Sequence, residues 1–80
     1  MATITCAITS PEKTATYDNL ASVSLPAFAG QMQVLPEHAE SFVLLRKGEV
    51  ILQKADGKKE SAQIPGGECY IKGDTVSIIL

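Results

Sequence analysis

The chain has 80 residues and a formal net charge of −2, which predicts one small domain spanning residues 1–80. Seven lysines and arginines against nine aspartates and glutamates form no basic stripe of the kind that binds nucleic acid, so no nucleic-acid partner is expected. No apolar run approaches the ~20 residues that span a bilayer, so we expect no direct insertion into a membrane.

Apolar residues recur at every second position in several segments, which is the period of a β-strand with one face toward a core. This alternation runs through residues 4–8, 21–25, 31–34 and 75–78. Turn residues separate the segments at intervals of about 8 to 12 residues, as in all-β sandwiches and barrels. The predicted fold class is therefore all-β, a flattened sandwich or barrel of short, mostly antiparallel strands with no C-terminal helical hairpin.

Glycine and proline mark the expected turns between these strands. Structural turns are assigned to Gly30, Pro36, Gly48, Gly57, Gly66, Gly67 and Gly73. Asp56-Gly57 is the strongest hairpin signal, a type I′ candidate between strands over Val50–Lys54 and Lys58–Ile64. Pro26 is expected to close the strand that begins at Ala21, because proline cannot donate to a ladder.

The two cysteines, Cys6 and Cys69, each lie in an apolar, strand-like run, and no apolar secretory leader precedes them. They could form at most one disulfide. We expect them to be reduced, buried core residues of a cytosolic protein.

Three apolar runs are continuous instead of alternating, over Phe42–Leu45, Val50–Leu52 and Ile78–Leu80. Strands of this composition are typically covered on both faces. A thin sandwich cannot cover both faces of three strands by itself. Either some of these side chains are simply exposed, or they form a docking face for a partner protein.

His38 is the only histidine, and it lies between Glu37 and Glu40. A structural zinc needs four ligands and a catalytic zinc three plus water, so no metal site is expected here. A serine or cysteine nucleophile would have only this histidine as its base, and no nucleophile motif surrounds any candidate. We therefore expect no catalytic residues and no cofactor. His38 is expected to be a half-exposed turn residue whose imidazole makes a local hydrogen bond.

The lysines after the Asp56-Gly57 turn suggest an alternative function. Lipoyl and biotinyl carrier domains present a modified lysine at the tip of a β-hairpin, and Lys58 and Lys59 occupy such a position. The flanking residues lack the surroundings that those families use. A solvated hairpin tip is the simpler interpretation.

Four segments in order resemble the ATP synthase epsilon subunit family, whose mitochondrial equivalent is delta. SPEK follows the first strand, and GQMQVLPEHAE is similar to the family's G-E-L-G-[VI]-[LY]-P-G-H-A-P loop. LLRKGEVIL resembles its I-K-P-G-x-[IV] hairpin, and IPGGECYIKGDTVSIIL its Gly-Gly ending. The chain departs from the pattern at Gln31, Glu37 and Glu40, where the family has Glu, Gly and Pro, and at Pro65, where it has Ser.

The resemblance covers residues 2–80 and implies the family's N-terminal flattened β-sandwich. It also implies a non-catalytic rotor subunit of a proton-translocating F-type ATP synthase. Such a subunit links gamma to the c ring, peripherally at the cytoplasmic face of a bacterial membrane. The family's C-terminal inhibitory hairpin has no counterpart before Leu80, so braking of hydrolysis is not expected. A stand-alone β-sandwich binding or carrier module is the alternative.

Carried over by position, the resemblance assigns two sets of contact residues. Contact with the c ring is expected from Gln31, Glu37, His38 and Glu40. Contact with gamma is expected from Phe42, Val43, Leu44, Val50 and Ile51, an assignment that rests on their hydrophobicity and not on a motif.

Overall fold

The computed structural model describes residues 2–80, which form eight β-strands and no helix. The strands are β1 (Ile4–Thr9), β2 (Thr14–Ala27), β3 (Gly30–Val34), β4 (Ser41–Leu45), β5 (Gly48–Lys54), β6 (Lys59–Ile64), β7 (Gly67–Lys72) and β8 (Thr75–Ile79). The predicted all-β class is confirmed. Nothing in residues 2–80 is a helix of the length and hydrophobicity needed to cross a membrane.

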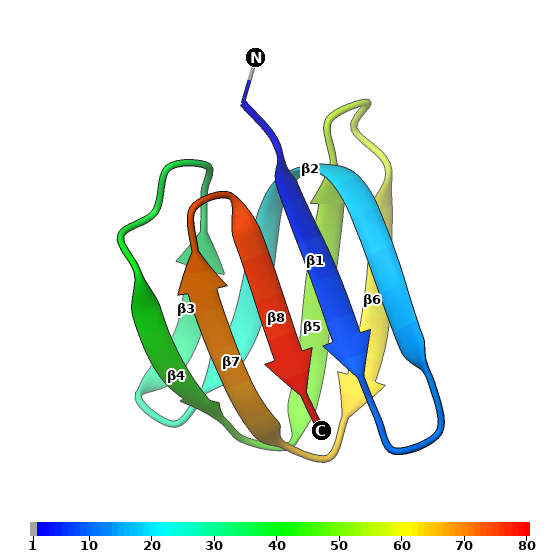
Figure 1. Cartoon of the computed structure of the whole chain (residues 1–80), viewed down its shortest axis with the longest axis vertical. Helices are drawn as coiled ribbons and strands as arrows, with labels where there is room; N and C mark the ends of the chain where they lie inside the picture. Colours follow the sequence, from blue (N-terminus) through cyan, green and yellow to red (C-terminus); the bar gives the residue numbers. More distant parts are fainter. Residues whose placement is uncertain (1) are drawn as a thin grey trace.

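The strands form a sandwich that closes on itself through β2. In Figure 1, β4, β7, β8 and β1 lie in the layer nearer the viewer, and β3, β5 and β6 lie behind. The first half of β2 pairs with β1, and its second half pairs with β3 and β5. β1 and β8 are parallel, whereas the other pairs formed within residues 2–80 are antiparallel. Hydrogen bonding thus continues between the layers, as in a flattened barrel.

Strand β2 changes layers at a bulge around Leu20. Its register against β1 gains one residue between Tyr17 and Leu20, and its register against β5 gains one between Leu20 and Ser22. Asn19 has a φ of 59°, a left-handed conformation that asparagine tolerates better than most residues. Extra residues of this kind bend a strand and increase its twist. The bulge therefore lets one strand serve both layers.

Side chains that alternate inward along the strands form a single core. Strand β1 has a strictly alternating burial pattern, and β8 alternates in the same way. The core residues are Ile4, Cys6, Ile8, Leu20, Val23, Leu25, Val34, Leu45, Val50, Leu52, Ile64, Cys69, Ile71, Val76 and Ile78. Because each strand contributes only one to three of these side chains, the outer faces of both layers are left available for contacts.

The structure corrects the expected strand end at Pro26. Strand β2 continues through Pro26 to Ala27, and the Pro26 carbonyl accepts a hydrogen bond of 2.8 Å from the Arg46 N–H. The β2–β5 ladder ends at Ser24, two residues before Pro26. The absence of an N–H on Pro26 therefore removes no hydrogen bond from that ladder. Gly48 lies against the same proline, because a Cβ on Gly48 would come within 2.9 Å of the Pro26 Cβ. This glycine is required by close packing.

The hairpin at Asp56-Gly57 is present, but its turn is not type I′. A type I′ turn needs positive φ at both central residues, and of these two only Gly57 has it, at 96°. The Gly57 N–H donates to the Lys54 carbonyl at 3.0 Å, and the Lys54 N–H donates to the Lys58 carbonyl at 2.7 Å. This three-residue loop is a type I turn followed by a glycine bulge.

The two cysteines are free thiols in the core, as expected, and both are fully buried. Cys6 pairs with Val76 and Cys69 pairs with Ile78, so strand β8 lies between them. Two strand spacings of about 4.8 Å already exceed the Cα separation that a disulfide permits. Burial raises the pKa of Cys6 to about 12, with a contribution from Cys69, and raises the pKa of Cys69 to about 11.

These shifts predict a loss of stability in alkali. The unfolded chain releases the thiol protons near pH 9.0, whereas the folded chain retains them to about pH 11 or 12. Above pH 9 the folded state therefore binds more protons, and the free energy of unfolding falls by about 1.4 kcal/mol per pH unit for each thiol. Urea unfolding between pH 9 and 11 should give this slope, and a Cys6→Ala/Cys69→Ala variant a shallower one. Equal slopes would contradict the assignment.

Candidate contact surfaces

The loop between β3 and β4 carries most of the residues assigned to c-ring contact. Pro36 and Glu37 form the turn that begins it, and Glu37 has a φ of 65°. Positive φ at the third residue of a turn is the requirement of type II, which glycine meets most easily. The pattern that this loop resembles has glycine at this position. For Glu37, which has a Cβ, the left-handed backbone conformation costs about 1 kcal/mol.

The strained turn is held by a carboxylate from the neighbouring β7–β8 turn. The Glu37 N–H donates to Oδ1 of Asp74 at 2.8 Å. The Asp74 carbonyl accepts the Thr5 N–H at 2.9 Å, which ties the same turn to β1. Figure 1 places the β3–β4 loop beside the β7–β8 turn at one end of the sandwich. Asp74 thus fixes the loop to the rigid sheet.

We expect Asp74→Ala to release this loop without unfolding the sandwich. Losing a hydrogen bond to a charged acceptor should raise the exchange rate of the Glu37 amide about tenfold or more. Asp74→Asn keeps an acceptor oxygen and should restore much of the protection. Amide exchange followed by NMR measures both variants. An unchanged Glu37 exchange rate in Asp74→Ala would show that the carboxylate does not hold the turn.

His38 is a half-exposed turn histidine with a local hydrogen bond, as expected from the sequence. Its Nδ1 lies 2.7 Å from the carbonyl oxygen of Ala39, and that oxygen also accepts the Ser41 hydroxyl at 3.1 Å. Within residues 2–80, no three histidine, cysteine, aspartate or glutamate side chains gather closely enough to hold a metal ion. The imidazole is therefore partly exposed and held by a contact within its own loop.

The four residues assigned to the c ring do not form one cluster. Glu37, His38 and Glu40 lie in the β3–β4 loop, whereas Gln31 lies at the start of β3, beside the β2–β3 turn. The two turns are at opposite ends of β3 in Figure 1. A strand of this length separates them by more than 10 Å. Gln31 therefore belongs to a different surface from the other three.

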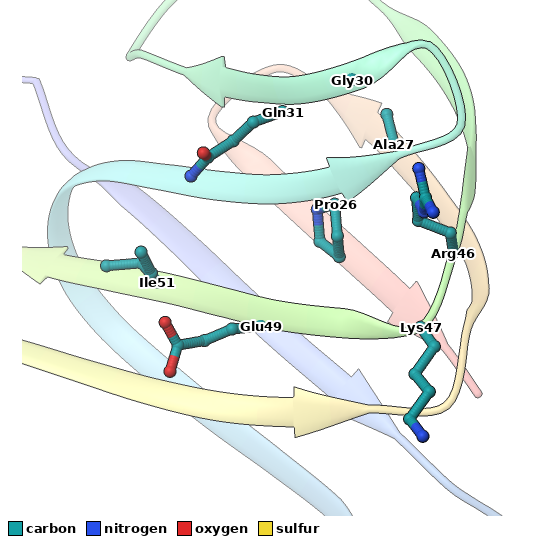
Figure 2. Close-up of a pocket in the computed structure, with 8 residues that line it drawn as sticks. All are labelled: Pro26, Ala27, Gly30, Gln31, Arg46, Lys47, Glu49 and Ile51. Carbon is teal, nitrogen blue, oxygen red and sulfur yellow. The ribbon is translucent and has the colours of Figure 1, made fainter.

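Gln31 lines a groove on the outer face of the layer formed by β2, β3 and β5. The groove has a volume of about 430 Å³ and is lined by Pro26, Ala27, Gly30, Gln31, Arg46, Lys47, Glu49 and Ile51. Figure 2 shows the labelled side chains of β3 and β5 on either side of Pro26 on β2. Arg46 and Lys47 come from the connection between β4 and β5.

The opposite layer carries an exposed apolar face on β4, β7 and β8. Phe42 and Leu44 are each 53% exposed, and Tyr70 and Ile79 are each 45% exposed. Phe42 pairs with Tyr70 across the β4–β7 ladder, and their ring centroids are 5.0 Å apart. These four residues, called the apolar face below, are outward-pointing side chains on three adjacent strands of one layer. Exposed apolar clusters of this kind mark interaction sites.

The structure corrects part of the assignment to gamma contact. Phe42 and Leu44 belong to the apolar face, but Val50 is fully buried and offers no surface to a partner. Val43 points inward and packs against the core. Ile51 is half-buried in the groove on the opposite layer. Two of the five residues therefore lie on the outer face of one layer, two face the core and one lies on the outer face of the other layer, because successive residues of a strand alternate between faces.

Sequence reasoning missed Tyr70 as a member of the apolar face and did not assign Ile79 to gamma, although Ile79 lies in the continuous apolar run Ile78–Leu80. In the structure each is an outward residue beside buried neighbours, Cys69 and Ile71 for Tyr70 and Ile78 for Ile79. The signal that identifies them is the pairing register, which aligns Tyr70 with Phe42. A single sequence does not contain that register.

The family model for the beta-sandwich domain of the ATP synthase delta/epsilon chain matches residues 3–80. This chain belongs to that family. The match spans the chain from β1 to β8, and its named architecture is the sandwich described above. Membership of this family leaves the carrier-domain alternative without support.

Individual members of the family are similar in sequence over much of the chain. The ATP synthase epsilon chain of a Sulfurovum species is 39% identical over 57 residues, covering 71% of this chain and 43% of that protein. The epsilon chain of a Nitratiruptor species is 31% identical over 80 residues, covering 100% of this chain and 62% of that protein. The chain thus spans about half the length of these relatives.

Two solved structures from the same kind of assembly have the same fold. A chain in the Euglena gracilis mitochondrial ATP synthase OSCP/F1/c-ring structure superposes with a TM-score of 0.89 at 23% identity, covering 99% of this chain and 51% of that chain. A chain in the Tetrahymena thermophila central stalk/c-ring structure gives 0.77 at 12% identity, covering 95% and 61%. The epsilon-type sandwich is therefore retained at low sequence identity.

Proposed function

We propose that this chain is a non-catalytic central-stalk subunit of a proton-translocating F-type ATP synthase, in which it links the gamma subunit to the c ring. The family match over residues 3–80 carries the proposal. The structures with the same fold come from assemblies described as F1/c-ring and central stalk/c-ring, which supports the same location for this chain. A linking subunit must present two separate surfaces on one rigid body.

The apolar face is assigned to gamma. A joint that transmits torque must resist shear, and a desolvated apolar centre with aromatic side chains provides such an interface. Phe42, Leu44, Tyr70 and Ile79 supply one apolar cluster on adjacent strands. This assignment keeps Phe42 and Leu44, adds Tyr70 and Ile79, and drops Val43 and Val50, which face the core, and Ile51, which lies on the opposite layer.

The β3–β4 loop is assigned to the c ring. Glu37 and Glu40 are exposed, His38 is half-exposed, and the loop lies at one end of the sandwich. A ring presents many equivalent polar loops, against which charged contacts set orientation more than affinity. The two acidic residues favour a ring surface that carries positive charge. The subunit would then be peripheral, at the cytoplasmic face of a bacterial membrane, through its partners.

Replacing both Glu37 and His38 with alanine is expected to weaken binding to isolated c ring about tenfold, because rim contacts contribute modestly and mainly through orientation. The melting temperature should change little, since neither side chain is buried. Surface-immobilised c ring in detergent gives the affinity, and calorimetry gives the stability.

Glu12→Ala/Lys13→Ala is the matched control. These residues lie in the β1–β2 turn, at the opposite end of the sandwich in Figure 1, and both are exposed. The control should bind the c ring like the unmodified chain. If the Glu37/His38 variant binds as tightly as the control, the loop is not the c-ring contact.

A further inference from the structure

One charged residue lies inside the apolar face. Glu68 on β7 pairs with Leu44 of β4 on one side and with Ile79 of β8 on the other. Paired residues on neighbouring strands have side chains about 5 Å apart. On its own strand, Tyr70 is the next outward residue. The Glu68 carboxylate therefore has three of the four apolar-face residues as its nearest outward neighbours.

The chain itself supplies no partner for this carboxylate. Glu68 is exposed, and within residues 2–80 it takes part in no ion pair and no side-chain hydrogen bond, the one ion pair there being Lys54–Glu60 on the other layer. The outward lysine of the same strand is Lys72, four residues farther along. That spacing is about 13 Å in a strand. As an exposed carboxylate, Glu68 is hydrated by solvent water.

A partner that covers the apolar face removes this water. An ionised carboxylate buried without a counter-charge is strongly unfavourable, whereas a well-placed cation with hydrogen bonds compensates for the lost hydration. Covering Phe42, Leu44, Tyr70 and Ile79 without covering Glu68 is not geometrically possible, because the glutamate lies between Leu44 and Ile79.

We propose that the gamma surface that binds this face carries a lysine or arginine opposite Glu68, surrounded by apolar side chains. Arginine suits the position better, since its planar guanidinium is weakly hydrated and binds a carboxylate through two hydrogen bonds. The ion pair fixes the register of an interface that apolar contacts alone would leave free to slide. This inference rests on the proposed function, in that gamma is the partner.

The test is the affinity of the full chain for purified gamma, with Glu68 replaced by leucine and by lysine. Glu68→Leu removes the charge and enlarges the apolar face. With a cation opposite, it leaves that cation buried and unpaired, and affinity should fall about tenfold or more. Without a cation, the added apolar contact should raise affinity. Glu68→Lys places like charges together and should lower affinity about 100-fold or more.

Two controls separate the inference from the function on which it rests. Glu49→Lys makes the same charge change on the outer face of the opposite layer, where Glu49 is exposed, and should leave affinity within about threefold. Melting temperatures verify that each variant is folded. Phe42→Ser is the second control and should weaken the complex in either case. If Glu68→Leu binds gamma as tightly as the unmodified chain or more tightly while Phe42→Ser still weakens binding, the ion pair is overturned and the proposed function stands. If the unmodified chain does not bind gamma, the proposed function itself fails.

Discussion

Replacing Phe42 and Leu44 together with serine is expected to lower the affinity of the chain for gamma by about 100-fold or more, because aromatic and aliphatic anchors at the centre of an interface contribute most of its binding energy. Both side chains are 53% exposed in the free chain, so their removal costs the fold little. Titration calorimetry with purified gamma measures the affinity, and thermal unfolding of the same samples measures stability.

Leu35→Ser is the matched control for this variant. Leu35 is also 53% exposed, but it follows β3 in the other layer and lies outside the apolar face. It should bind gamma with nearly unchanged affinity. Equal losses for the control and the double variant would mean that the chain binds gamma through general hydrophobicity and not through the apolar face.

Gly67→Ala is expected to cause the largest loss of stability among single substitutions of a surface glycine. Gly67 has a φ of 150°, and a Cβ there would collide with the carbonyl oxygen of Ile79 and come within 3.3 Å of the Leu80 Cα. Backbone strain and steric overlap together cost about 3 kcal/mol or more. In a domain of this size such a loss lowers the melting temperature by about 15 °C.

Gly57→Ala separates the steric contribution from the conformational one. Gly57 also has positive φ, 96°, but no atom lies within 4 Å of the position that its Cβ would take. Its substitution should cost only the left-handed conformation, about 1 kcal/mol. Chemical denaturation of both variants gives the two values. A Gly67 variant no less stable than the Gly57 variant would refute the collision with β8.

The fold class could be predicted from the sequence because a strand with one buried face has apolar residues at alternate positions. Residues 4–8 and 75–78 alternate strictly, and both segments are strands with alternating burial. The path of β2 was not accessible. The sequence predicts a strand only from Ala21 onward, whereas β2 begins at Thr14, and the bulge around Leu20 keeps the strand continuous and turns it into the second layer. A bulge and a break have the same local composition.

The hairpin at Asp56-Gly57 shows a similar limit. The dipeptide correctly located the turn, but one more loop residue, Ala55, changes a two-residue type I′ loop into a type I turn with a glycine bulge. An Asp-Gly dipeptide is compatible with both types of loop. The register of the flanking strands decides between them, and it depends on which residues of β5 and β6 reach the core.

The contact surfaces were only partly predictable. The continuous apolar run in β4 identified a strand with an exposed apolar face, and Phe42 and Leu44 form part of that face. The run could not indicate which residues point inward, so Val43 and Val50 were assigned to the surface although they pack in the core. Tyr70 and Ile79 join the face only through strand pairing between distant parts of the chain.

In the proposed function, this sandwich joins gamma to the c ring through two different surfaces. The most direct measurement is the amount of gamma that sediments with c rings reconstituted in vesicles, in the presence and absence of the chain. The chain should increase sedimented gamma, and both the Phe42→Ser/Leu44→Ser and the Glu37→Ala/His38→Ala variants should reduce that increase. The same amount of gamma with and without the chain would contradict it.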